Sequence, residues 1–272
     1  MIDGVSVSKA CRYLNISRQA YYQHCARSVE REAHEDRVIQ FVRQERMTQP
    51  SIGARKLKYL LANVKLSIGR DHLFNLLREK RLLAPTKRAY HKTTNNHHRL
   101  RSHPNLIKAG FKADKPNQLW VADITYLPTR SGESYLSLIT DAYSRKIVGY
   151  QVDDNMRTES VKKAFTLALK QKSTNEKLVH HSDRRIQYCS EEHQKLHNKY
   201  DVQCSMTEGY DCYQNALAER INGILKNEYL LTKPCNLEEA RKMVAESVAI
   251  YNGRRPHMAL KYKTPDEVHQ AF

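Results

Sequence analysis

The chain has 272 residues, 40% of them hydrophobic and 28% charged, which excludes a disordered tail and allows one large core with one or two small helical units. No apolar run approaches the roughly 18 residues that a membrane span needs, and the N-terminus lacks the layout of a signal peptide, so we expect a cytoplasmic protein with no membrane partner. The formal net charge of +17 favours a polyanion, above all nucleic acid, although a structural RNA-binding protein would satisfy the composition as well.

Two helical units are expected at the N-terminus. Residues 1–33 predict a helix-turn-helix, in which Ser17 is the N-cap of the second helix. Residues 34–85 predict a second all-helical DNA-binding domain that Pro85 ends. Two such patterns in a basic chain favour DNA contact, although each side chain taken singly fits a solvated helix face equally well. The candidate contacts are Arg18, Tyr21, Arg55, Lys56 and Lys58.

Residues 86–117 follow as a polar, basic stretch without a hydrophobic period. Such a stretch is typical of a linker between domains. Residues 51–115 together contain 16 basic and 3 acidic residues, so most of the excess positive charge lies in and beside this linker.

From about residue 118 the pattern changes to alternating apolar and polar residues. Residues 118–152 predict a three-stranded antiparallel meander, and the chain then continues as helix, strand, helix, strand and long helix. The order β-β-β-α-β-α-β-α describes an α/β fold in which helices flank a mixed sheet, as in ribonuclease H-like proteins. We expect this core over residues 118–232, followed by a C-terminal helix and tail over 233–272.

Three acidic residues stand out within the predicted core. Asp123 interrupts the first strand, Asp183 directly follows the strand "KLVHHS", and Glu219 lies on the polar face of an amphipathic helix. Three converging carboxylates repel one another unless cations are bound, so they favour Mg²⁺ or Mn²⁺. Two such ions about 4 Å apart suit an in-line displacement at phosphorus. Arg184 and Arg185 would then face a phosphate backbone.

Several neighbouring residues favour structural roles. His180 and His181 are poor ligands for magnesium, so we expect them to pack in the core or to orient other groups. Asp141 is expected to cap a turn, Trp120 to anchor the core, and Asp153 to lie on the surface.

The motifs themselves resemble a known family. "WVADITYL", "HHSDRRIQYCS" and "GYDCYQNALAERINGILKNEY" are similar to the three catalytic blocks of DDE transposases of the insertion-sequence-three family, relatives of retroviral integrases. Between Asp183 and Glu219 lie 35 residues, which is the spacing of that family. The closing stretch "YNGRRPHMALKYKTPDEV" and the helical N-terminal region extend the resemblance to nearly the whole chain.

The resemblance implies metal-dependent DNA cleavage and strand transfer at the ends of an insertion sequence. It assigns Asp123, Asp183 and Glu219 as the catalytic, metal-binding triad, and Lys226 as a DNA contact. Asn215 and Asn222 are further candidates for contact with the element end. The implied partners are the terminal inverted repeats, target DNA, other copies of the chain bound to DNA and the protein of the upstream reading frame. The implied location is the bacterial nucleoid.

Two departures from the family pattern suggest reduced activity. Arg185 and Ile186 replace a usual Gly-Ser pair, and Gln214 replaces a usual Asp. If Arg185 takes the place of a glycine in a tight turn, either its backbone is strained or the turn differs. A hydrolytic nuclease of the same fold and a catalytically decayed DNA-binding protein therefore stay open as alternatives.

Overall fold

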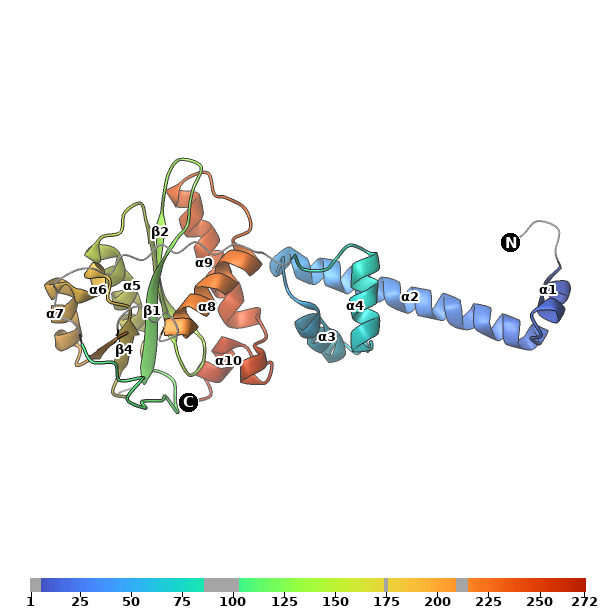
Figure 1. The fold of residues 1–272 in the computed structure, drawn as a ribbon, viewed down its shortest axis with the longest axis horizontal. Helices are drawn as coiled ribbons and strands as arrows, with labels where there is room; N and C mark the ends of the chain where they lie inside the picture. Colours follow the sequence, from blue (N-terminus) through green and yellow to red (C-terminus); the bar gives the residue numbers. More distant parts are fainter. Residues whose placement is uncertain (1–5, 86–102, 174–175, 209–214) are drawn as a thin grey trace. The chain divides into compact units, whose positions relative to one another are not determined.

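The computed structural model describes residues 6–85, 103–173, 176–208 and 215–272, and its residues form two compact units (Figure 1). The helical unit contains residues up to 84 except 49–51. The sheet unit contains residues 49–51 and those from 85 onward. None of the helices in the described ranges combines the length and the apolar character needed to cross a bilayer.

The helical unit consists of four helices: α1 (Val7–Tyr13), α2 (Arg18–Thr48), α3 (Ala54–Asn63) and α4 (Arg70–Glu79). Ser17 caps α2 as expected, because its Oγ accepts a hydrogen bond from the backbone nitrogen of Ala20 at 3.0 Å. The C-terminal half of α2 packs with α3 and α4 around an apolar core of their own. That core is formed by Val38, Ile39, Val42, Ile52, Leu57, Leu61, Ile68, Leu73, Leu76 and Leu77.

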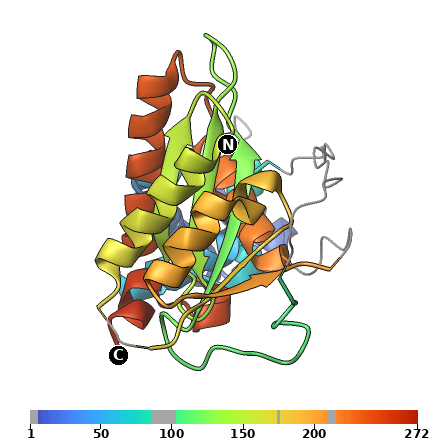
Figure 2. The ribbon, with the colours of Figure 1, turned by 90° about the vertical axis from the view of Figure 1, so that its left-hand side faces the viewer.

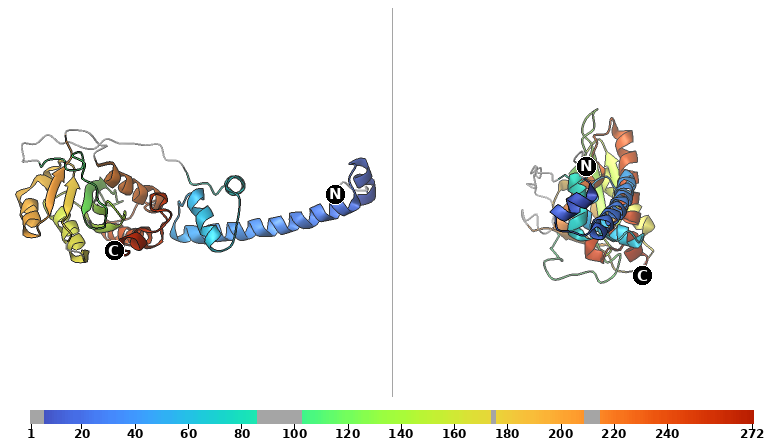
Figure 3. Two further views of the ribbon diagram at one scale, coloured as in Figure 1. Left: turned by 90° about the horizontal axis from the view of Figure 1, so that it is seen from below. Right: turned by 90° about the vertical axis from the view of Figure 1, so that its right-hand side faces the viewer.

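The expected domain boundary between residues 33 and 34 is wrong. It falls inside α2, which runs for 31 residues without a break and is drawn as a single long helix in Figure 3. Residues 18–48 contain neither glycine nor proline, so nothing in the backbone chemistry stops the helix there. The expected start of the second unit therefore lies within this helix.

The sheet unit is built on five strands in the order β3-β2-β1-β4-β5. Strands β1 (Leu119–Tyr126), β2 (Tyr135–Asp141) and β3 (Ile147–Asp153) form the expected antiparallel meander. Strands β4 (Val179–Ser182) and β5 (Gln203–Met206) extend it in parallel beyond β1. The result is the mixed sheet that the ribonuclease H-like interpretation requires.

Helices cover both faces of this sheet (Figure 2). On one face lie α5 (Thr158–Gln171), α6 (Ile186–Cys189) and α7 (Glu191–Lys199); on the other lie α8 (Ala216–Ile224), the π-helical turn η2 (Leu225–Tyr229) and α9 (Leu237–Arg254). A short 3₁₀ turn, η3 (Met258–Leu260), and α10 (Pro265–His269) complete the chain. Each layer buries its own apolar cluster against the sheet.

The C-terminal helix belongs to this unit, which corrects the expected boundary at residue 232. Val244, Val248 and Tyr251 of α9 are buried in the same cluster as Leu136 and Leu138 of β2. The apolar face of α9 and the apolar face of the sheet are both removed from water when they pack against each other. Residues 233–272 are therefore one of the layers of the core.

The expected linker is also shorter than 86–117. Residues 86–102 lie outside the described part of the chain, but from residue 103 the backbone runs beside β5. The carbonyl of Pro104 accepts from the nitrogen of Met206 at 3.3 Å, and the nitrogen of Leu106 donates to Ser205 Oγ at 3.0 Å. These hydrogen bonds satisfy backbone groups at the sheet edge.

Most of the expected structural residues lie where predicted. Trp120 is fully buried, and His180 and His181 pack in the interior of the sheet unit. The carboxylate of Asp141 accepts from the nitrogen of Ser144 at 2.7 Å and so caps the turn. Asp153 was expected at the surface but is buried, because it accepts a hydrogen bond from Ser160 Oγ at 2.7 Å and ties β3 to α5.

Candidate active site

Strand pairing brings Asp123 and Asp183 together. In the parallel pair of β1 and β4, Ala122 lies opposite Ser182, so the next residues along the two strands are the two aspartates. Side chains alternate along a strand, and Ala122 and Ile124 are buried towards α5. Asp123 therefore points to the other face of the sheet, where α8 lies.

Asp123 is held by two hydrogen bonds in a largely buried position. Its Oδ1 accepts from the nitrogen of Ile124 and its Oδ2 from Nδ2 of Asn222, both at 2.8 Å. Burial raises the pKa of the carboxyl to about 7; the negative charge of Asp183 adds to this, and the positive charge of Arg185 opposes it. The cost of burying this carboxylate in its charged form is therefore only partly offset by Arg185 and the two hydrogen bonds.

Glu219 belongs to the same group of charges. It lies on α8 three residues before Asn222, and residues at this spacing share one face of a helix. Because Asn222 bonds Asp123, that face is turned to the aspartates. Burial and the charge of Asp183 raise the pKa of Glu219, although its side chain is exposed. The structure thus places all three predicted acids at one site.

Lys226 lies four residues beyond Asn222, in the π-helical turn η2. Partial burial lowers the pKa of its ammonium group, and the charge of Asp123 opposes this effect. Lys226 therefore lies close enough to Asp123 for their charges to interact. A π turn that continues an α-helix is frequent at functional sites.

The two asparagines that were expected to contact the element end are bonded to β1. Both are buried, with 5% of Asn215 and 4% of Asn222 exposed. Asn215 Nδ2 donates to the carbonyl of Ala122 at 2.9 Å and joins the start of α8 to β1. The spacing of Glu219, Asn222 and Lys226 was a usable signal for one shared helix face, but nothing in the sequence indicated the bond from Asn215.

Arg185 also lies elsewhere than expected. Its side chain turns inward to the aspartates instead of outward to a phosphate backbone, and its Nε lies 2.9 Å from Asp183 Oδ2. Its backbone has φ −65° and ψ 148°, which is open to any L-residue, so the turn is unstrained. Neighbouring Ile186 is exposed, and Gln214 lies outside the described residues.

The structure gives the positions of the remaining DNA-contact candidates within each unit. Arg184 Nε donates to the carbonyl of Thr207 at 2.5 Å. In the helical unit, Arg18, Arg55 and Lys58 are exposed, whereas Tyr21 and Lys56 are partly buried. These five residues belong to α2 and α3, and nothing in the structure assigns them a ligand.

Tyr188 is a neighbour of the site that the sequence did not indicate. Its side chain is buried, and burial together with the charges of Asp183 and Asp123 raises its pKa well above the usual range. The phenol therefore stays protonated beside the carboxylates.

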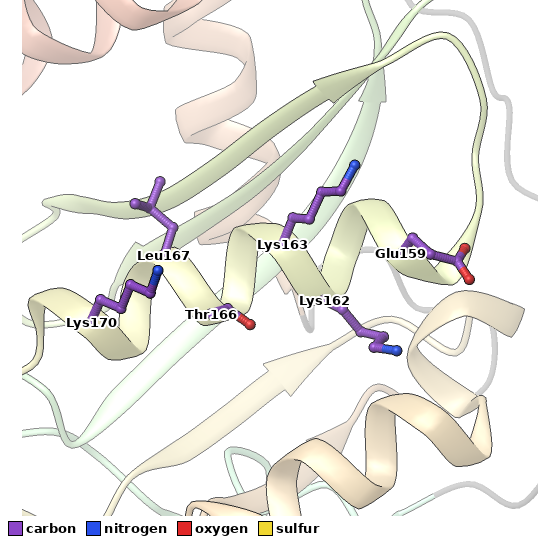
Figure 4. A pocket seen from close by; sticks show the side chains of 6 residues that line it. All are labelled: Glu159, Lys162, Lys163, Thr166, Leu167 and Lys170. Carbon is purple, nitrogen blue, oxygen red and sulfur yellow. The ribbon is translucent and has the colours of Figure 1, made fainter.

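A separate hollow runs along α5 (Figure 4). Its lining residues are Glu159, Lys162, Lys163, Thr166, Leu167 and Lys170. Lys162 Nζ pairs with Glu192 at 2.8 Å, and Lys163 Nζ lies 3.9 Å from Asp153. None of the three candidate acids lines this hollow, so it is not the candidate site.

Sequence comparison identifies two overlapping matches to family models. Residues 113–212 and 200–265 each match a model described as an integrase core domain. Together these matches cover residues 113–265, which lie in the sheet unit and include Asp123, Asp183 and Glu219.

Two curated relatives are similar along most of the chain. An uncharacterized 31 kDa protein of insertion element IS600 from Shigella sonnei is 35% identical over 94% of this chain and 95% of its own length. The transposase for insertion sequence element IS904 from Lactococcus lactis is 32% identical over 79% of this chain and 86% of its own.

A solved structure supports the fold. A chain of the simian T-cell lymphotropic virus intasome, determined by cryo-EM in complex with a PP2A regulatory subunit, matches with a TM-score of 0.51 and 16% identity. The match covers 80% of this chain and 70% of the viral one. At this identity the likeness concerns architecture alone.

Proposed function

The chain belongs to the transposases of bacterial insertion sequences, which are DDE-type polynucleotidyl transferases, and on this premise we propose which of its residues carry DNA cleavage and strand transfer. The observation that supports the proposal is the convergence of Asp123, Asp183 and Glu219 from β1, the end of β4 and α8. We assign these three carboxylates as the catalytic triad.

The three carboxylates fit a divalent cation. Carboxylate oxygens are the ligands that Mg²⁺ and Mn²⁺ prefer, and the raised pKa values of Asp123 and Glu219 reflect their burial and the negative charge of Asp183 beside them. We propose that they hold Mg²⁺ or Mn²⁺, as two ions during catalysis. When bound, such ions supply activation of the attacking oxygen and stabilisation of the leaving oxygen at phosphorus.

The surrounding residues prepare the acids for this task. Asn222 fixes the orientation of the Asp123 carboxylate, and Asn215 holds the first turn of α8 on β1. Lys226 offers an ammonium group on the same side of the helix, where it would bind a phosphate of the element end. Positioned groups of this kind act without moving during the reaction.

We assign recognition of the element ends to the helical unit. A helix that enters the major groove reads base edges, whereas contacts of a catalytic core with phosphates carry no sequence information. Arg18, Tyr21, Arg55, Lys56 and Lys58 are the proposed contacts. The proposed partners are the terminal inverted repeats, target DNA, further copies of this chain on the DNA, and the upstream-frame protein; the proposed location is the nucleoid in the cytoplasm.

The test is a cleavage assay with Asp183→Asn. We expect this variant to lose cleavage of an element end while it keeps the affinity of the parent for that end, because the substitution removes a metal ligand and no DNA contact. Asp154→Asn is the matched control, since Asp154 is an exposed aspartate whose side chain accepts a local hydrogen bond from Asn155. Parental cleavage by Asp183→Asn would contradict the assignment.

A further inference from the structure

The guanidinium of Arg185 lies between the carboxylates of Asp123 and Asp183. Its Nε is 2.9 Å from Asp183 Oδ2, and its Nη2 is 3.7 Å from Asp123 Oδ1. Its Nη1 donates to the carbonyl of Ile124 at 2.6 Å, and only 14% of its side chain is exposed. A cation of the chain itself therefore lies where two strands bring two anions together.

The four carboxylate oxygens of the two aspartates already have partners in the protein. Asp183 Oδ1 accepts from the backbone nitrogen of Arg185 at 3.2 Å, and its Oδ2 binds the guanidinium. Both oxygens of Asp123 accept hydrogen bonds, from Ile124 and from Asn222. A magnesium ion requires oxygen lone pairs at about 2.0–2.1 Å in near-octahedral geometry. The ion would compete with the guanidinium for Asp183 Oδ2 and would lie beside the same positive charge at Asp123.

Charge repulsion prevents the divalent ion and the guanidinium from binding the two carboxylates at the same time. A divalent ion and a guanidinium at the same pair of carboxylates repel each other, and screening is weak in a place that is largely closed to water. The carboxylates therefore bind one or the other.

We propose that Arg185 is a tethered cation that competes with the divalent metal ion for Asp123 and Asp183. A metal ion binds only to molecules in which the guanidinium has left the aspartates, so its apparent affinity is lowered by the fraction of such molecules. The inference rests on the proposed function, because it takes the two aspartates as metal ligands.

The backbone at Arg185 makes the inference testable by substitution. Its conformation at the start of α6 is open to any residue, so a change at this position acts through the side chain and not through the turn. Arg185→Ala removes the guanidinium. Arg185→Gln removes its charge but keeps a hydrogen-bond donor of similar reach, and serves if Arg185→Ala fails to fold.

The experiment is a titration of full-length, untagged, metal-free protein with Mn²⁺, in which electron paramagnetic resonance measures the free ion. We expect Arg185→Ala and Arg185→Gln to bind Mn²⁺ at least about tenfold more tightly than the parent. Arg184→Ala is the matched control, because it removes the same charge from the adjacent residue, whose Nε binds the carbonyl of Thr207. We expect its Mn²⁺ affinity to stay within about twofold of the parent's.

Adding Asp183→Asn to Arg185→Ala separates this inference from the proposed function. We expect the double variant to lose the tight binding. If Arg185→Ala and Arg185→Gln bound Mn²⁺ no more tightly than the parent, while Asp183→Asn alone abolished binding, competition would be refuted and the metal site would stand. An equal gain in Arg184→Ala would also refute competition, since net charge would explain it. If Asp183→Asn left the Mn²⁺ affinity unchanged both in the parent and in Arg185→Ala, the metal site itself would be refuted.

Thermal unfolding supplies a second readout. In a chelating buffer we expect Arg185→Ala to unfold at a lower temperature than the parent, because the aspartates lose their buried counter-charge. Mn²⁺ should then raise its unfolding temperature more than that of the parent. An equal rise in both proteins would contradict the competition.

Discussion

At the scale of single residues, Asp123 has the most informative chemistry. Burial raises the pKa of its carboxyl from the usual 3.8 to about 7, and Asp183 adds to the effect against the opposing charge of Arg185. A carboxyl with a pKa that is higher in the folded than in the unfolded protein binds protons more strongly when folded. Between about pH 4 and pH 7 the contribution of this carboxyl to the free energy of unfolding of the metal-free protein therefore falls as the pH rises.

This linkage predicts a pH-dependent effect of Asp123→Asn. The amide carries no charge, so the variant avoids ionising a buried carboxyl above pH 7. We measure the unfolding temperature of both proteins by circular dichroism in a chelating buffer. We expect the unfolding temperature of the variant minus that of the parent to increase from pH 5 to pH 8. The difference between two proteins cancels the pH dependence of the other groups. A difference that is the same at both pH values would contradict the raised pKa.

The three acids were predictable from the sequence and their surroundings were not. A charged residue inside a strand, another at a strand end and a third on a polar helix face each stand out locally. The inward turn of Arg185 depends on how β1 and β4 are paired, because its partners come from both. The register of two strands that lie far apart in the sequence is fixed by packing, so only the structure reveals it.

At the scale of elements, β3 and α5 approach each other unusually closely at Gly149. A Cβ atom at this position would lie 2.2 Å from the backbone oxygen of Ala164 and 2.9 Å from the Cβ of Ala168. Backbone cannot move aside as a flexible side chain does, so strand and helix would have to separate.

Gly149→Ala should therefore lower the free energy of unfolding by about 3 kcal/mol or more, measured by urea denaturation. Gly223→Ala in α8 is the control, because its new methyl group would meet nothing nearer than Asn227 Nδ2 at 4.0 Å. An alanine in a helix is favoured over glycine, so we expect this control to be unchanged or more stable by about 0.5–1 kcal/mol. Similar stabilities for the two variants would contradict the close approach.

Element type was easier to predict than element extent. Alternation in the sequence indicated that β1, β2 and β3 are strands, although most residues of β1 and β2 are buried because helices cover both faces of the sheet. The unbroken helix α2 was missed, since its first half is mostly exposed and shows no apolar stripe that would distinguish a helix from a linker. The role of α9 as a layer of the core was missed because its partner residues, such as Leu136 and Leu138, lie more than 100 residues earlier.

At the scale of the whole molecule, positive charge is divided unequally. Residues 1–102 contain 21 basic and 8 acidic residues, a net charge of +13, whereas residues 103–272 contain 25 and 21, a net charge of +4. The helical unit also has an apolar core of its own. The part of the chain that we assign to end recognition thus carries most of the attraction for DNA.

A fragment of residues 1–102 should therefore fold and bind DNA without the sheet unit. We expect its affinity to fall steeply as salt rises, with a slope of about −0.9 for each phosphate contact in a plot of log K against log salt concentration. The fragment of residues 103–272 is the comparison, and fluorescence anisotropy at several salt concentrations measures both. Weaker binding by residues 1–102 than by residues 103–272 at low salt would overturn this division of labour.

The most direct test of the central claim is a joining assay with a pre-cleaved element end and target DNA at a fixed Mg²⁺ concentration. We expect joined product from the parent, more of it from Arg185→Gly, and none from Asp183→Asn, because the triad performs strand transfer and Arg185 competes for its metal. Cleavage without joining in both the parent and Arg185→Gly would indicate a hydrolytic nuclease. Joining by Asp183→Asn at the level of the parent would contradict the account directly.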